Sequence, residues 1–371
     1  MHNRACLISF SWVPFSRVSF CRAISLLLAF SWTALLAAQN PAQLPVEKDA
    51  SAPPAGNAIQ LDVVVTAKSG PPVAGLEEKD FTLLDNKTPE KITSFKAVSG
   101  SDADAEVILL IDGVNTTYQT IAYARGEIDK FLRANGGHLA HPIRIAILTD
   151  TGARVQESSS TDGNAVAASL DQQTVALRSI TRSAGFYGAV DRFDLSMQAL
   201  SQLATAEAAH PGRKFILWVS PGWPLLSGPN VQLDGKQQQQ LFGDVVQAST
   251  QLREARITLY AVNPLGSAES TLRVFYYQSF LKGVSKPSQV SAGNLALQVL
   301  AAQSGGLVLN SSNDITALLQ QAFADTDAWY EISFEPAAAE HPDEYHQIQV
   351  RVDKPGLTAR TRLGYYAQPR R

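Results

Sequence analysis

Three oxygen-bearing side chains, Asp112, Asn115 and Thr116, stand directly after a buried-strand pattern. The preceding run, residues 106–111, reads EVILLI, which is typical of a central parallel strand covered on both faces. Open α/β sheets bind ligands where such strands end. The sequence therefore predicts a binding site beside Asp112. For the Asp112 carboxylate itself we expect a structural role: it caps the following helix or accepts hydrogen bonds from neighbouring loop amides.

A second polar group follows another buried-strand pattern, Phe215–Val219. Ser220 follows this run, and Trp223 lies between Pro221 and Pro224. We interpret Ser220 and Trp223 as part of the same contact face, with Trp223 either as an exposed aromatic anchor or as buried packing. Ser220 also partly matches a nucleophile elbow, but Trp218 stands where that motif has glycine. A serine hydrolase at Ser220 is therefore kept only as an alternative.

Other catalytic patterns are missing from the sequence. The six histidines form no His-Glu-x-x-His motif, and no glycine-rich phosphate loop follows a strand. Both cysteines, Cys6 and Cys21, lie near the N-terminus, so the rest of the chain has neither a thiol nucleophile nor a cysteine metal site. We expect a protein that is not an enzyme.

Strand and helix patterns alternate through residues 104–326, which predicts an α/β unit with a mostly parallel, doubly wound sheet. Shorter β patterns flank it at 58–100 and 327–368. Each flank is too small to hold a core alone, so we expect the two to form one small antiparallel β-sandwich, with the α/β unit inserted between them. Expected helices include residues 121–133, 193–208, 245–256, 295–303 and 314–323.

The N-terminal residues have the pattern of an export signal. Arg4, Arg17 and Arg22 precede an apolar stretch at residues 23–38, and no acidic residue comes before Glu47. This order predicts a signal peptide at 1–38, with an uncleaved membrane anchor as the alternative. Residues 39–57 are rich in proline and alanine and predict a linker.

Composition and charge restrict the function classes. The 371-residue chain is 45% hydrophobic and 18% charged, as is usual for a globular protein. Removing the three leader arginines from 31 basic residues leaves 28 against 34 acidic residues, a net charge of about −6. This acidic balance excludes a nucleic-acid-binding role, which requires a basic face. Contact with a membrane is expected only through an uncleaved leader.

Seven short stretches support a family resemblance by their order and spacing: Gly70–Leu76, Asp80–Asn86, Leu110–Asp112 with Asn115-Thr116, Pro211–Lys214, Tyr260–Val262, Ser304–Gly306 and Leu363–Tyr366. With these stretches the chain resembles the VWFA-related proteins abundant in Acidobacteria, from about residue 59 to 367. The resemblance implies a von Willebrand factor type A (VWA) core and an exported location: periplasm, cell envelope or outside the cell. It implies no reaction.

The resemblance also implies a metal site, and this sequence departs from its pattern. A functional VWA site takes Asp-x-Ser-x-Ser from its first loop, a threonine from its second and an aspartate from its third. Asp112 and Thr116 match the first loop, but Val114 replaces a ligand and Pro221 stands in place of the last aspartate. Asn115 offers a replacement oxygen. Such a site suits Mg²⁺, which prefers oxygen ligands.

We therefore expect an exported VWA-like protein with a degenerate metal site and a protein-binding or scaffolding role. The expected cofactor is none, or Mg²⁺ at Asp112, Asn115 and Thr116. The expected partner is a protein. The alternatives are a metal-dependent adhesin that uses Asp112 and Thr116, and a hydrolase at Ser220.

Overall fold

The computed structural model describes residues 58–68, 70–100, 104–177, 185–226, 232–266 and 275–369. The predicted leader (1–38) and linker (39–57) lie outside these residues. None of the helices in the described ranges is both long enough and apolar enough to cross a membrane.

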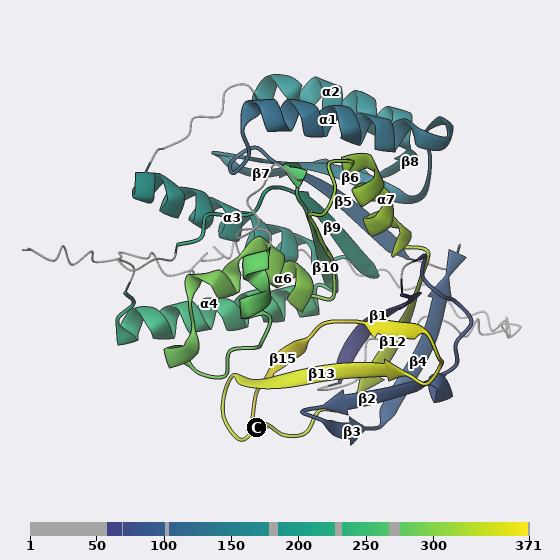
Figure 1. Ribbon diagram of the computed structural model, residues 1–371, viewed down its shortest axis with the longest axis vertical. Coiled ribbons are helices and arrows are strands. Elements are labelled where there is room, and N and C mark those ends of the chain that lie inside the picture. Colours follow the sequence, from purple (N-terminus) through teal and green to yellow (C-terminus); the bar gives the residue numbers. More distant parts are fainter. Residues whose placement is uncertain are drawn as a thin grey trace, which may run out of the picture. The chain divides into compact units, whose positions relative to one another are not determined.

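A seven-stranded sheet forms the centre of the α/β unit (Figure 1). Its strand order is β11-β10-β9-β5-β6-β7, and β8 also pairs with β6. The strands from β11 to β6 are parallel to one another, whereas β7 and β8 run antiparallel to β6. The prediction of a mixed α/β fold with a mostly parallel sheet is confirmed. The strands are β5 (Ala105–Asp112), β6 (His138–Thr149), β7 (Gly152–Val155), β8 (Ser160–Asp162), β9 (Arg213–Val219), β10 (Ile257–Val262) and β11 (Val308–Leu309).

Helices cover both faces of this sheet (Figure 1). Helices α1, α2 and α7 pack on one face, and α3, α4 and α6 lie on the other. This double covering explains why β5 and β9 read as continuous apolar runs, since neither face of these strands meets water. The helices are α1 (Tyr118–Arg133), α2 (Gly163–Leu177), α3 (Gly185–Glu207), α4 (Gly235–Glu254), α6 (Leu297–Gln303) and α7 (Ile315–Ala324).

Helix α3 is longer than the sequence predicted. The sequence predicts a helix from residue 193, but α3 starts at Gly185. Two glycines lower the helix propensity of residues 185–192, which hid this first part of the helix. Gly188 is buried, so packing offsets its low propensity.

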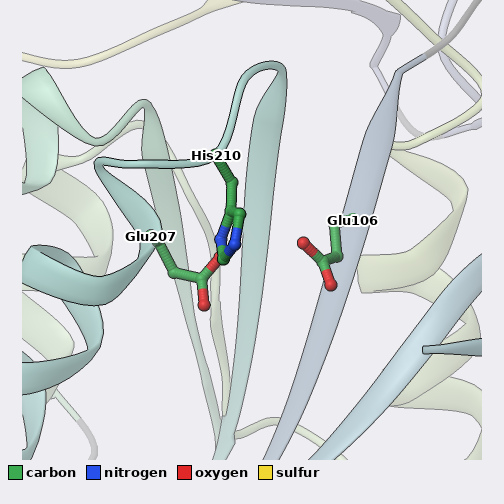
Figure 2. A group of neighbouring side chains, drawn as sticks. All are labelled: Glu106, Glu207 and His210. Carbon is green, nitrogen blue, oxygen red and sulfur yellow. The ribbon is translucent and has the colours of Figure 1, made fainter. Parts of the chain in front are cut away.

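Different polar groups lie at the two ends of the central strands. Asp112 and Ser220 come at the carboxyl ends of β5 and β9. At the amino ends of the same strands, α3 ends at Glu207 and the chain turns through His210 into β9. This turn lies beside Glu106, near the start of β5 (Figure 2). The sheet therefore has two separate polar clusters, one at each end of its central strands.

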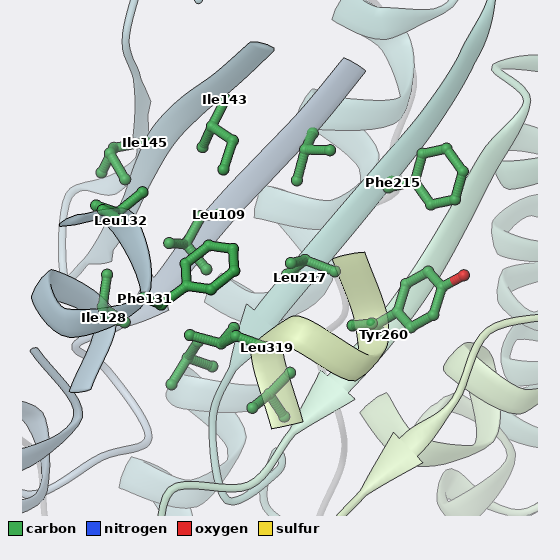
Figure 3. Close-up of a cluster of buried hydrophobic side chains, with 14 of the residues drawn as sticks. Leu109, Ile128, Phe131, Leu132, Ile143, Ile145, Phe215, Leu217, Tyr260 and Leu319 are labelled. Carbon is green, nitrogen blue, oxygen red and sulfur yellow. The ribbon is translucent and has the colours of Figure 1, made fainter. Parts of the chain in front are cut away.

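The core between the sheet and α1, α2 and α7 is a continuous cluster of aliphatic and aromatic side chains (Figure 3). Alternate residues of β5, such as Leu109, point into it and meet Ile128 and Phe131 of α1. Leu217 and Tyr260 continue the cluster along β9 and β10. These contacts fix the strand ends that position Asp112.

The flanking segments pair with each other in two antiparallel four-stranded sheets, with orders β14-β1-β12-β4 and β15-β13-β2-β3. Apolar residues of both sheets, including Leu61 and Val350, share one hydrophobic cluster. That these sheets form a separate small sandwich, with limits at 58–100 and 327–368, stays a prediction. The strands are β1 (Ile59–Ala67), β2 (Phe81–Asp85), β3 (Thr88–Glu90), β4 (Ile92–Ser99), β12 (Ala328–Phe334), β13 (Glu344–Val352), β14 (Leu357–Arg360) and β15 (Gly364–Ala367).

Candidate functional site

Asp112 is the last residue of β5, and its side chain is fully buried. It does not cap the following helix, because Thr117 does so by accepting a hydrogen bond from the Thr120 amide at 3.2 Å. Instead, one Asp112 oxygen, Oδ1, accepts the backbone N–H groups of Val114 at 2.9 Å and Asn115 at 2.8 Å. The loop-amide role expected from the sequence is therefore confirmed.

The second oxygen, Oδ2, accepts three side-chain donors. Asn115 donates through Nδ2 at 2.9 Å, Trp218 through Nε1 at 3.2 Å and Ser220 through Oγ at 2.8 Å. Together with the two amides, five donors surround one carboxylate. Hydrogen bonds to an ionised acceptor are the stronger kind, so this network stabilises a buried negative charge without a cation.

The same network extends to the helix on the far side of the site. Asn115 also donates through Nδ2 to Ser196 Oγ at 2.9 Å, and Ser196 donates to the Arg192 carbonyl at 2.7 Å. Ser196 lies in α3 and is fully buried. Asn115 thus links the loop after β5 to α3, and Asp112 links the end of β5 to Trp218 of β9.

Two oxygens next to this network have no hydrogen-bond partner. Asn115 Oδ1 and Thr116 Oγ1 are both buried and unsatisfied. Val114, between them and Asp112 in the sequence, is also buried, at 3% exposed. The two free oxygens are the observation that favours a bound ion or polar ligand at this place.

The donor chemistry around Asp112 does not fit Mg²⁺. This ion requires a near-octahedral set of oxygen lone pairs directed at it. Every group that approaches Asp112 Oδ2 presents a hydrogen instead, and the remaining free oxygens, on Asn115 and Thr116, are neutral. An ion here would first have to displace the Ser220 hydroxyl and the Trp218 indole from the carboxylate.

The structure brings Ser220 into the site but buries it completely. Trp223 is also buried, at 1% exposed, with its ring 5.2 Å from that of Trp218. The expectation that Trp223 is an exposed aromatic anchor is wrong, because the chain after Pro221 folds its indole into the interior. The other possibility, buried packing, describes it. A partner contact through Ser220 stays a prediction.

Two members of the site could not be identified from the sequence. Trp218 lies within an apolar run, where its indole N–H is hidden among hydrophobic neighbours, and Ser196 lies inside a helix. A tryptophan at the end of a buried strand is the only signal, since a buried indole N–H usually finds an acceptor.

No protein-family model matches this sequence, and no curated protein matches it. Solved structures with a similar fold include VWA domains at low sequence identity. The von Willebrand factor type A protein from Catenulispora acidiphila is 10% identical to this chain, with a TM-score of 0.31. The match covers 85% of this chain and 75% of the Catenulispora chain. The manganese-loaded TRAP protein of Plasmodium vivax is 8% identical, with coverages of 72% and 96% and a TM-score of 0.34.

The pilus adhesin SpaC from Lactobacillus rhamnosus GG is also similar. It is 9% identical and covers 78% of this chain, with a TM-score of 0.36. This chain spans about half the length of SpaC, 49%. These likenesses concern the fold and say nothing of what this chain binds.

Proposed function

We propose that this chain is an exported VWA-like protein, related to the acidobacterial VWFA-related proteins, that binds a protein partner without using a metal ion at Asp112. The observation that supports binding without a metal ion is that the Asp112 carboxylate accepts five hydrogen bonds from its own chain. These hydrogen bonds hold the loops in place and occupy the carboxylate oxygens that would otherwise ligate an ion.

The proposed contact surface lies around this buried site and not in it. Tyr118, at the start of α1, is 58% exposed, and Tyr187, near the start of α3, is 71% exposed. Both helices have their first residues on the side where β5 and β9 end, because α1 follows β5 and α3 leads back to the start of β9. Exposed tyrosines at such an edge suit protein recognition, since tyrosine is enriched at interfaces.

Capture of a partner from an envelope extract tests this proposal. We expect Tyr118→Ser with Tyr187→Ser to abolish recovery of whichever protein the wild-type chain retains, and EDTA to leave recovery unchanged. Tyr123→Ser is the matched control, because this tyrosine is also exposed, at 49%, but lies further along α1. Equal recovery by all three chains would contradict the proposed surface.

A metal-dependent adhesin is the second candidate, and the unsatisfied oxygens of Asn115 and Thr116 favour it. The same experiment separates the two candidates. Recovery that requires Mg²⁺ and disappears in EDTA would support the adhesin and contradict metal-free binding.

A serine hydrolase at Ser220 has the weakest support. The Ser220 hydroxyl donates to a carboxylate at 2.8 Å, accepts from the Gly222 amide at 3.1 Å and is fully buried. We therefore expect a serine-reactive phosphonate to leave Ser220 unmodified in the native chain, as judged by peptide mass spectrometry. Labelling of Ser220 that Ser220→Ala removes would revive the hydrolase.

A further inference from the structure

A second polar cluster lies at the amino ends of the central strands, away from Asp112. It contains Glu106 of β5, Glu207 at the end of α3 and His210 in the turn that follows (Figure 2). One ligand atom from each residue lies within 4.8 Å of the others. No part of the proposed function uses these residues.

Rigid elements hold each of the three side chains. Glu207 is 1% exposed, and its Oε2 lies 3.2 Å from His210 Nδ1. Lys214 donates from Nζ to the His210 carbonyl and so fixes the turn. Gly212 closes this turn with φ +79°, where a side chain would collide with the Asp104 carbonyl at 2.7 Å. The imidazole is therefore set beside both carboxylates before any ligand arrives.

Arg144 holds the carboxylates but leaves oxygens for a ligand. Its guanidinium pairs with Oε1 of Glu106 and, at 2.7 Å, with Oε1 of Glu207. The second oxygen of Glu207 faces His210 and not Arg144. Outer partners of this kind orient the ligands of many metal sites.

The cluster is also open to solvent at His210. Two cations contact the group: Arg144 pairs with both carboxylates, and Lys214 donates to the His210 carbonyl. The His210 side chain is 53% exposed, so an ion and a water ligand can enter from solvent.

We propose that Glu106, Glu207 and His210 form a binding site for a divalent transition-metal ion of the zinc class. One imidazole nitrogen and two carboxylate oxygens are ligands that Zn²⁺ takes, with water in the fourth position. Mg²⁺ and Ca²⁺ favour all-oxygen sets and do not suit a group that includes imidazole. The site is independent of the surface proposed for partner binding.

Calorimetric titration and thermal melts of the untagged full chain, after EDTA treatment and dialysis, test this site. We expect one Zn²⁺ per chain and a rise in Tm of about 3–6 °C at about 100-fold excess over Kd. Mg²⁺ at the same concentration should leave Tm unchanged.

Variants at the ligand positions decide whether these residues hold the ion. His210→Ala removes an exposed ring and should weaken Zn²⁺ binding at least about tenfold while leaving the zinc-free melt unchanged. Glu106→Gln should weaken it likewise, and it decides the question if His210→Ala is itself unstable. His138→Ala is the matched control, since this histidine is exposed and outside the cluster. The absence of a zinc-dependent shift, or an undiminished shift in both ligand variants, would overturn the site.

Discussion

Asp112→Ala is expected to lower the free energy of unfolding by about 3–5 kcal/mol, and by the same amount in EDTA and in millimolar Mg²⁺. The variant removes the acceptor of five hydrogen bonds and leaves the Trp218 indole, the Ser220 hydroxyl and two loop amides buried without a partner. Each buried donor left unsatisfied costs about 1–3 kcal/mol. Urea denaturation of the wild type and the variant measures the difference.

The control for this prediction is Asp129→Ala. Asp129 lies on α1, where its exposed carboxylate pairs with Arg133 at 2.9 Å. An exposed pair of this kind contributes at most about 1 kcal/mol. Asp112→Asn is a further comparison, because it keeps the volume but places an amide donor among donors. If Mg²⁺ raised the wild-type stability and Asp112→Ala removed only that gain, the carboxylate would be a metal ligand and the hydrogen-bond account would be wrong.

The sequence predicted the position of Asp112 because a buried parallel strand leaves a continuous apolar run with a clear end. It also predicted that the carboxylate serves its own loop, since local geometry decides that contact. It could not predict the partners on Oδ2. Trp218 reaches Asp112 because β5 and β9 are adjacent in the sheet, with Leu110 opposite Trp218. Strand order across the sheet is a property of the whole fold.

The burial of Trp223 shows a second limit of the sequence. An indole flanked by prolines is compatible with either a surface anchor or a packed loop. Its burial depends on a contact with the Trp218 ring that forms only in the folded chain. The Glu106–Glu207–His210 cluster shows a third limit of prediction from the sequence. Only the Glu207 and His210 spacing was visible in the sequence, and Glu106 joins them because α3 returns the chain to the start of β9, which pairs with β5.

A single guanidinium separates two carboxylates that face each other across strands. Asp62 of β1 and Glu331 of β12 are paired in register, and like charges in that arrangement are destabilising. Arg256 Nη2 lies 2.5 Å from Asp62 Oδ1 and 2.6 Å from Glu331 Oε1. Arg256 has φ +52°, a conformation that favours glycine. An arginine occurs there despite this strain because its side chain bridges the two acids.

Arg256→Gly is therefore expected to lower the free energy of unfolding by about 3–5 kcal/mol at pH 7, although it relieves the backbone. The substitution removes the guanidinium that pairs with both of these mostly buried carboxylates. Adding Glu331→Gln should restore a large part of the loss, because only one acid then remains. Urea denaturation of the single and double variants in a mutant cycle measures this coupling.

The loss should also depend on pH, because Arg256 changes the ionisation of Asp62. Burial raises the pKa of Asp62, but the charges of Arg256 and Arg213 outweigh it, so the pKa in the folded protein lies below its usual 3.8. A lowered folded pKa contributes stability that is fully present above the unfolded pKa and is lost as the pH falls through the folded value. In the Arg256→Gly variant, Asp62 should lose much of this stabilisation, because Arg256 is the strongest of the positive charges that lower its pKa.

The difference in unfolding free energy between wild type and Arg256→Gly should therefore be fully present near pH 7 and shrink once the pH falls below the unfolded value of 3.8. Denaturation curves at several pH values measure this trend. A difference that stays constant over the whole range would mean that Arg256 acts through packing of its aliphatic stem, and the bridge between Asp62 and Glu331 would carry no net stabilisation. A difference that narrows on acidification, together with rescue by Glu331→Gln, would assign the stabilisation to charge, at the point where the paired β strands meet the turn between α4 and β10.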